Sequence, residues 1–321
     1  MRVLSGIQPS GIMHLGNYFG AIQQYLELQS KHECLFFIAN FHAMTSIHDN
    51  KILKENTLQV AIDYLALGLD PEKSSLFIQS DIPELTELTW FFSSITNMGL
   101  LERCHSYKDK IANNATPSHA LFSYPLLMAA DILIYKSNLV PVGKDQIQHL
   151  EVTRDVAQSF NHTFKTDIFP LPEGYTPDHV ALVPGIDGQK MSKSYENTIP
   201  IFGPEKKLRK IIMSIKTDSL EMDDPKDPDS CNIFNLYRLF ATEDQKTDLA
   251  NRYRKGGLGY GHAKQELFEL MLDYFSDART KREELMNDHS YVQAALKKGA
   301  EKARAIAIET MKEVRTLVGI N

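Results

Sequence analysis

Residues 5–22 read SGIQPSGIMHLGNYFGAI, and this stretch decides the class of fold. Its first residues end a short apolar run that is typical of a β-strand, and its last residues begin a helical pattern. Between them lies a turn rich in glycine and small polar residues. A strand, a glycine-rich turn and a helix in this order form the layout with which α/β proteins hold nucleotides. The turn matches neither the GxGxxG pattern nor the GK[ST] of a P-loop.

The first two-thirds of the chain alternates short strand-like runs with longer helical patterns. Strands separated by helices predict an α/β fold with a doubly wound parallel sheet. Asn50 is expected to cap the helix 51–68, and Gly68 is expected to end it. The expected strands are 2–8, 34–40, 75–80, 139–142 and 179–184, and the expected helices lie near 17–30, 51–68, 84–97, 118–135 and 145–160.

After about residue 200 the strand signal disappears. The last segment keeps one side of a helix apolar through Val292, Leu296, Ala303, Ile306, Val314 and Leu317. We therefore expect a Rossmann-like domain over residues 1–200 and an all-helical domain over residues 201–321.

Composition narrows the class of protein. The chain has 321 residues, a net charge of −6 and 43% hydrophobic residues, as in ordinary soluble domains. The three cysteines form no CxxC pair, so neither a disulfide framework nor a metal site is expected. The most apolar run, 124–135, is too short for a membrane span, and the chain enters a strand at once, without room for a signal peptide. These features predict a cytoplasmic protein without membrane association.

A second motif, DGQKMSKSYENT, occupies residues 187–198. Lys190 and Lys193 lie three residues apart among glycine and serine. Paired ammonium groups on a loop of small residues suit a polyphosphate, whose negative charge grows at the bridging oxygen as it is cleaved. Taken alone, such a string is usually just an exposed loop.

Together, HLGN (14–17) and KMSKS (190–194) resemble the two signature motifs of class I aminoacyl-tRNA synthetases. His14 at a helix N-terminus suits a phosphate contact, and Gly16 leaves room for adenine against the backbone. The resemblance implies catalytic roles for His14, Asn17, Lys190 and Lys193. It implies ATP binding by Gln8, Pro9, Ser10, Gly16, Asn17, Gly143, Lys144, Asp145, Val183, Lys190, Met191, Ser192, Lys193 and Ser194. Lys110 resembles a phosphate-contacting lysine of the family, and this is the weaker assignment because Lys108 lies two residues away.

The middle of the chain selects one family within that class. Residues 124–161, YPLLMAADILIYKSNLVPVGKDQIQHLEVTRDVAQSFN, are similar to the tryptophanyl-tRNA synthetase family almost throughout. FHAMT (41–45), LERCHSYKDK (101–110) and GLGYGHAKQEL (257–267) match as well, so the resemblance covers essentially the whole chain. It implies tryptophan binding by Asp131, Tyr124, Met128, Gln146, His42, Val140 and Val142. For the apolar members core packing explains the residues equally well, and for His42 a structural role stays open.

Asp131 stands out on physical grounds as well. A carboxylate inside an apolar helix is costly unless it has a hydrogen-bond donor. One interpretation is a structural aspartate bonded to a nearby Arg, Lys or backbone amide. The other, which the resemblance favours, is an acceptor for the indole N–H, a group that phenylalanine lacks.

The resemblance implies a tryptophan–tRNA ligase. Its substrates would be L-tryptophan, ATP and tRNA(Trp), with Mg²⁺ carried by the phosphates rather than held in a protein cage, and its assembly would be a homodimer. Residues 281–315 and the basic run 203–216 are the expected tRNA contacts. Alternatives are a tyrosyl-type synthetase, a small nucleotidyltransferase, and a non-catalytic RNA-binding paralogue.

Overall fold

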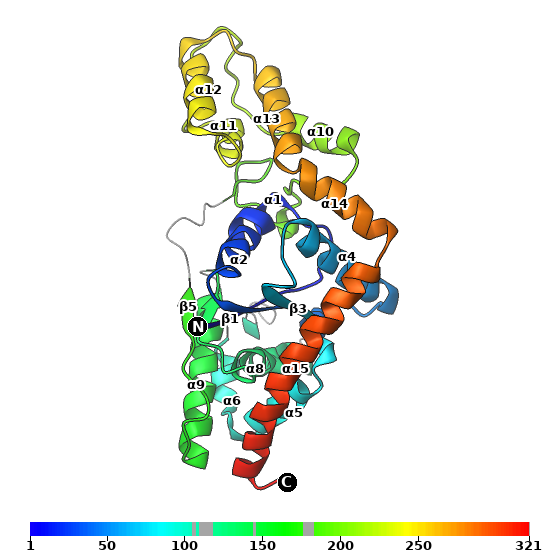
Figure 1. Cartoon of the computed structure of the whole chain (residues 1–321). Coiled ribbons are helices and arrows are strands. Elements are labelled where there is room, and N and C mark those ends of the chain that lie inside the picture. The colour runs from blue at the N-terminus through cyan, green and yellow to red at the C-terminus, as the bar shows by residue number, and fades with distance from the viewer. Residues whose placement is uncertain (105–106, 109–117, 144–145, 176–182, 321) are drawn as a thin grey trace. The chain divides into compact units, whose positions relative to one another are not determined.

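The computed structural model describes residues 1–104, 107–108, 118–143, 146–175 and 183–320. The chain divides into two compact units (Figure 1). Unit 1 comprises Met1–Gly11, Leu26–Asp178 and Asp288–Asn321, and unit 2 comprises Ile12–Tyr25 and His179–Asn287. This division differs from the boundary expected near residue 200. The expected boundary separates two functions, and it stays a prediction.

Unit 1 is built on a five-stranded sheet in the order β3-β2-β1-β4-β5, with every pair of neighbours parallel. The strands are β1 (Arg2–Ile7), β2 (Glu33–Ile38), β3 (Ser74–Ile78), β4 (Leu139–Pro141) and β5 (Glu173–Tyr175). The predicted parallel sheet is confirmed. The order reverses between β1 and β4, and in such sheets ligands bind beyond the carboxyl ends of the strands at this switch point.

The fifth strand differs from expectation. It is formed by Glu173–Tyr175 rather than by residues 179–184. Of the predicted strand, residues 179–182 lie outside the described part of the chain, and Pro184 forms only an isolated bridge with Lys190. The run Glu173–Tyr175 has no β-branched residue, so its sequence carries little strand signal.

The helices of unit 1 follow the predicted alternation closely. Asp49, rather than Asn50, caps the second long helix, because its carboxylate accepts from the backbone N–H groups of Lys51 and Ile52. Gly68 follows that helix with φ +106°, as expected of a residue that ends a helix. The helices are α3 (Asn40–Ala43), α4 (Asn50–Ala66), α5 (Glu84–Ile95), α6 (Met98–Glu102), α8 (His119–Leu133), α9 (Ile147–Phe164) and α15 (Ser290–Val318), with a 3₁₀ turn η2 (Gln79–Asp81).

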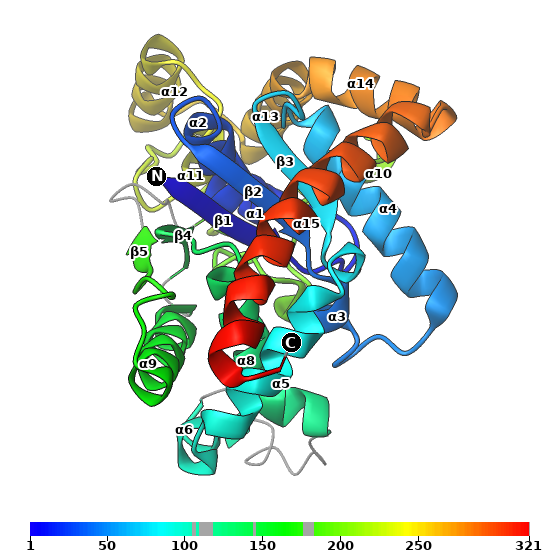
Figure 2. The same ribbon diagram turned by 60° about the horizontal axis from the view of Figure 1, so that its bottom comes forward.

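Helix α15 is the C-terminal part of the chain, yet it packs in unit 1. It contacts β3, α5 and α4, and Figure 2 shows it in red as it passes across β3. A Cβ atom at Gly299 would lie 2.0 Å from the carbonyl oxygen of Leu76, so the helix backbone lies directly against the strand. Leu317, expected on the apolar face, is exposed instead. Residues 290–318 therefore cover the sheet rather than join the other helices after residue 200.

Unit 2 is helical. Tyr18, Phe19, Phe240, Tyr274 and Phe275 pack as a cluster of mostly edge-to-face rings that runs from the buried Tyr18, Phe240 and Phe275 to the exposed Tyr274. Its elements are α1 (Leu15–Asn17), a π-helical turn η1 (Tyr18–Ile22), the start of α2 (Gln23–Leu28), a 3₁₀ turn η4 (Lys193–Tyr195), α10 (Glu205–Met213), α11 (Asn232–Tyr237), α12 (Glu243–Lys255), α13 (Tyr260–Tyr274) and α14 (Ser276–Asn287).

Candidate active site

The two sequence motifs meet in unit 2 although about 175 residues separate them. The backbone N–H of Leu15 donates to the carbonyl of Ile199 at 3.0 Å, and the N–H of Ile201 donates to the carbonyl of Met13 at 3.2 Å. The N–H of Gly16 points at the sulfur of Met191 at 3.3 Å. The turn before α1 and the KMSKS loop are thus parts of one local structure.

His14 is buried in this structure and lies at the start of α1. Burial lowers the pKa of His14 from 6.5 to about 4, and the positive charge of Lys193 acts in the same direction. The imidazole is therefore neutral at pH 7. Within the described residues its Nδ1 has no hydrogen-bond partner, which is unusual for a buried polar atom.

Gly16 packs closely against two side chains. A Cβ atom there would lie 3.0 Å from the His14 ring and 3.4 Å from the Cβ of Met191. Asn17 accepts a hydrogen bond from the His14 backbone N–H through Oδ1 at 3.1 Å. Its amide NH₂ is therefore the end that remains as a donor, consistent with the expected contact to ribose or phosphate.

Asn197 organises the KMSKS loop, and the sequence patterns predicted no role for it. Its Oδ1 accepts from the backbone N–H of Ser192 at 2.8 Å. Its Nδ2 donates to the carbonyl of Lys190 at 3.1 Å and to Asp187 Oδ1 at 2.8 Å. One buried side chain thus fixes the backbone on both sides of Met191. The only signal for it in the sequence is its place within residues 187–198.

The other predicted ATP residues fall into three groups. Val183 and Met191 are buried in unit 2, where the N–H of Met191 donates to the carbonyl of Val183 at 2.9 Å, and Ser192 Oγ caps η4 by accepting from the N–H of Ser194. Gln8, Pro9, Ser10 and Gly143 belong to unit 1. Lys110, Lys144 and Asp145 lie outside the described residues.

Asp131 lies on α8 in unit 1 and is 2% exposed. Its Oδ2 is 2.8 Å from Nε2 of His42, and Nε2 of Gln79 donates to Oδ1 at 2.8 Å and to Oδ2 at 3.0 Å. Burial raises the pKa of the Asp131 carboxyl, while the hydrogen bonds from His42 and Gln79 oppose that rise. His42 and Asp131, both predicted to bind tryptophan, are therefore hydrogen-bonded to each other. Gln79 was not among the predicted residues, although its place directly after β3 is where site residues of parallel sheets occur.

A second polar chain runs through Tyr124, His149 and Gln146 in the same unit. The Tyr124 hydroxyl is hydrogen-bonded to Nε2 of His149, and Nδ1 of His149 lies 2.9 Å from Oε1 of Gln146. The rings of Tyr124 and His42 meet edge to face at 6.2 Å between centroids, which joins this chain to the Asp131 group. His149, which was also not predicted, follows Gln146 by three residues on one helix face.

The predicted apolar contacts have two different environments. Val140 is 4% exposed and belongs to the main core of unit 1. Met128 and Val142 are partly exposed and pack against that core. Packing thus accounts for Val140, whereas Met128 and Val142 keep surface available for a substrate.

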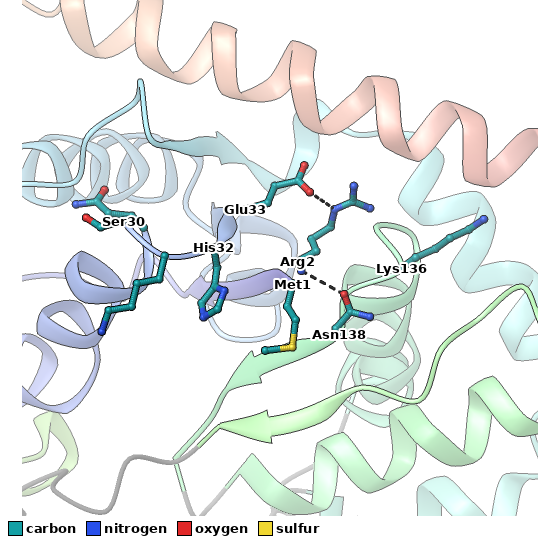
Figure 3. Close-up of a pocket in the computed structure, with 9 residues that line it drawn as sticks. Met1, Arg2, Ser30, His32, Glu33, Lys136 and Asn138 are labelled. Carbon is teal, nitrogen blue, oxygen red and sulfur yellow. Dashed lines mark hydrogen bonds and ion pairs between the residues drawn. The ribbon is translucent and has the colours of Figure 1, made fainter.

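One cavity of unit 1 lies elsewhere (Figure 3). It has a volume of about 540 Å³ and lies at the amino ends of β1 and β2. Arg2 is paired with Glu33 at 3.1 Å, and Lys136 is paired with Glu313 at 2.9 Å. Because the expected site is at the carboxyl ends of the strands, this cavity is not the candidate active site.

Comparisons with known proteins identify the family to which the chain belongs. A family model described as "tRNA synthetases class I (W and Y)" matches residues 1–276. The chain belongs to this family. The chain is 54% identical over 319 residues to the tryptophan–tRNA ligase of Fusobacterium nucleatum, and the match covers 99% of this chain and 98% of that protein. It is similar to the crystal structure of the tryptophanyl-tRNA synthetase of Campylobacter jejuni complexed with ADP and tryptophan, with a TM-score of 0.96, 53% identity and full coverage of both chains.

Two further observations bear on ligands and location. In the part of the chain that the structure describes, no three His, Cys, Asp or Glu side chains gather as a metal would require. Within those same residues, no helix has both the length and the apolar character needed to cross a membrane.

Proposed function

We propose that this chain is a tryptophan–tRNA ligase, which joins L-tryptophan to tRNA(Trp) at the expense of ATP. The observation that carries the proposal is the buried Asp131 carboxylate, held by His42 and Gln79 beside the Tyr124 chain. It is supported by full-length relatives above 50% identity that are tryptophan–tRNA ligases. A tyrosyl-type enzyme needs groups that read a hydroxyl, and a buried acceptor between apolar side chains fits an indole N–H better.

In the first step, the tryptophan carboxylate attacks the α-phosphorus of ATP and pyrophosphate leaves. This reaction needs little acid–base chemistry, so alignment of the reactants and stabilisation of the developing charge carry it. His14, neutral at pH 7, donates one hydrogen bond to phosphate without placing a fixed charge there. Lys190 and Lys193 carry positive charges that stabilise the negative charge developing on the leaving pyrophosphate. Mg²⁺ carried by the phosphates would supply further charge neutralisation, as is usual for a metal held mainly by its substrate and water.

The residues that bind ATP and tryptophan are part of this proposal. As the resemblance implies, ATP is assigned to residues 8–10, 16–17, 143–145, 183 and 190–194. Tryptophan is assigned to Asp131, Tyr124, Gln146 and His42, with Met128 and Val142 along the indole. In the second step, the terminal ribose hydroxyl of tRNA takes the acyl group from the adenylate.

The remaining assignments concern the assembly. We place residues 1–200 in the catalytic function and residues 201–321 chiefly in anticodon recognition. We also propose a cytoplasmic homodimer. Light scattering of the purified protein tests the dimer, and a monomer at micromolar concentration would contradict it.

The proposed activity is tested by isotope exchange of pyrophosphate into ATP. Exchange should depend on tryptophan and not on tyrosine, and tRNA(Trp) should then accept the tryptophanyl group. Exchange with tyrosine in place of tryptophan would identify a tyrosyl enzyme. Absence of exchange with either amino acid would favour a non-catalytic RNA-binding protein.

A further inference from the structure

Gln79 is a buried amide whose orientation is fixed by the backbone. It is 1% exposed and follows β3 in the turn η2. Its Oε1 accepts from the backbone N–H of Phe41 at 3.0 Å. A backbone N–H can only donate, so the oxygen of the amide must face Phe41. The NH₂ end of Gln79 must therefore face Asp131.

The same hydrogen bonds join three elements of unit 1. Phe41 belongs to α3, directly after β2, whereas Gln79 follows β3 and Asp131 lies on α8. Beside them, Asn40 and Ser80 are hydrogen-bonded reciprocally, with Asn40 Nδ2 2.8 Å from Ser80 Oγ and Ser80 N 3.1 Å from Asn40 Oδ1. The carboxyl ends of β2 and β3 are thus tied together where Gln79 meets the carboxylate. This bracing leaves the Gln79 amide little freedom to turn.

Gln79 and His42 together determine which further hydrogen bonds the Asp131 carboxylate can accept. An ionised carboxylate has about four lone-pair directions and can only accept hydrogen bonds. His42 and Gln79 account for three contacts, which hold the carboxylate in one rotamer and oppose the rise in its pKa that burial causes. The carboxylate can accept one further hydrogen bond. A substrate without a donor group leaves that hydrogen bond unmade.

We propose that Gln79 is a positioning residue for substrate specificity: by holding the Asp131 carboxylate through its NH₂ end, it makes that carboxylate a selective acceptor for the indole N–H. The inference rests on the proposed function, because it takes tryptophan as the substrate. It adds a residue that does not itself contact the substrate, and it explains why the aspartate recognises a donor although it already has two protein partners.

The test compares tryptophan with its analogue in which sulfur replaces the indole nitrogen, which has the same shape and no N–H. Gln79→Met keeps the bulk and removes the donor. We expect kcat/KM for tryptophan in pyrophosphate exchange to fall about 10- to 100-fold, chiefly through KM, as for the removal of a hydrogen bond to a charged group. The inhibition constant of the sulfur analogue should change less than about threefold. Asp131→Asn serves as the reference and should show the same selective loss.

Gln29 provides the matched control. It is similarly buried and bridges backbone groups, with Nε2 donating to Gly68 at 3.2 Å and Oε1 accepting from Asp70 at 2.9 Å. Gln29→Met should lower the melting temperature and leave unchanged both kcat/KM for tryptophan and the inhibition constant of the sulfur analogue. If Gln79→Met does not fold, Gln79→His replaces it. Because histidine keeps a donor, kcat/KM for tryptophan should fall less than in Asp131→Asn, and an equal loss for tryptophan and the sulfur analogue would overturn the inference.

Two results would overturn the inference. One is an equal loss for tryptophan and the sulfur analogue in the Gln79 variant, which a structural role would produce. The other is an unchanged kcat/KM for tryptophan. Both are read against the unmodified protein, whose tryptophan-dependent exchange tests the proposed function separately.

Discussion

Lys193 is the residue at which charge is expected to matter most for the chemistry. Its effect on the pKa of His14 places its charge near the start of α1. Lys193→Ala should reduce the rate of adenylate formation by about 10²–10³, with little change in KM for tryptophan, because one donor to the developing pyrophosphate charge is removed. Single-turnover adenylation measures this. The exposed Lys206 of α10 is the control, since Lys206→Ala should leave the rate unchanged.

Asn197 allows the geometry of the loop to be separated from its charge. Asn197→Ala should reduce the adenylation rate in the same way as Lys193→Ala, but by a smaller factor, because the backbone around Lys190 loses its anchor. Asn161→Ala is the matched control and should leave the adenylation rate unchanged. Asn161 braces the backbone of Phe169 in unit 1 through both ends of its amide. A rise in KM for tryptophan with an unchanged adenylation rate would count against both lysine and asparagine roles.

His14 gives the protein a pH dependence of stability whose sign can be worked out. Its pKa is about 4 in the folded chain and 6.5 in the reference state, so between these values the unfolded chain binds more protons. The contribution is therefore fully present above pH 6.5 and is lost as pH falls toward 4. At most it amounts to about 3 kcal/mol, because each pKa unit is worth about 1.4 kcal/mol.

Urea unfolding of the unmodified protein and His14→Gln at several values between about pH 4.5 and pH 7.5 checks this. The unfolding free energy should decline less in the variant as pH is lowered. Parallel curves for the two proteins would mean that His14 does not titrate as its burial indicates.

Among the elements, α15 shows how strongly packing overrides local preference. Glycine in a helix interior normally costs about 1 kcal/mol relative to alanine. At Gly299 the missing side chain instead allows the helix to approach β3, since a Cβ would lie 2.0 Å from the Leu76 oxygen.

Gly299→Ala should therefore lower the unfolding free energy by about 1–3 kcal/mol, as overpacking of a core does. Gly261 in α13 is the matched control, because a Cβ there meets nothing within 4 Å. Gly261→Ala should be neutral or stabilising by up to about 1 kcal/mol. Chemical denaturation followed by circular dichroism distinguishes the two, and equal effects of both substitutions would refute the close contact at Gly299.

At the scale of the whole molecule, the structure alters which cations we expect to contact tRNA. Lys298 is paired with Glu72 at 2.6 Å and Arg304 with Glu84 at 2.9 Å, so these cations of α15 are neutralised by acids of the same unit. They are weaker candidates for RNA contacts than the sequence indicated. In α10, by contrast, Leu208 and Ile212 are buried while Lys206, Lys207 and Lys210 are exposed.

Reversal of the three α10 lysines to glutamate should weaken aminoacylation and flatten its salt dependence, with a change of about 0.7–0.9 in the log–log slope for each phosphate that is no longer neutralised. Adenylate formation should stay intact. Lys298→Glu is the comparison, and we expect it to lower stability through repulsion by Glu72 while leaving the salt slope unchanged. Aminoacylation that is indifferent to the α10 reversal would remove the basic run from the tRNA surface.

The sequence by itself determined the class of fold and predicted the chemistry of the site. Alternating apolar runs and helical periods predict a parallel sheet, because these patterns follow from backbone geometry that each segment carries locally. The HLGN and KMSKS motifs predicted an ATP site through their resemblance to the signature motifs of class I synthetases, and these site residues stay a prediction. Asp131 could be singled out because a carboxylate in an apolar run demands a partner, but the run does not contain that partner.

Tertiary structure decided the rest. The partners of Asp131 are His42 and Gln79, which lie 89 and 52 residues away in sequence and meet it only because β2 and β3 end at the same edge of the sheet. The lowered pKa of His14 depends on burial and on Lys193, and neither is visible in the turn itself. The place of α15 follows from the fit of Gly299 against β3 rather than from its helical pattern, which any apolar surface would satisfy. Burial, long-range hydrogen bonds and close backbone contacts are properties of the packed chain, so the local sequence predicts that they are needed without predicting which residues supply them.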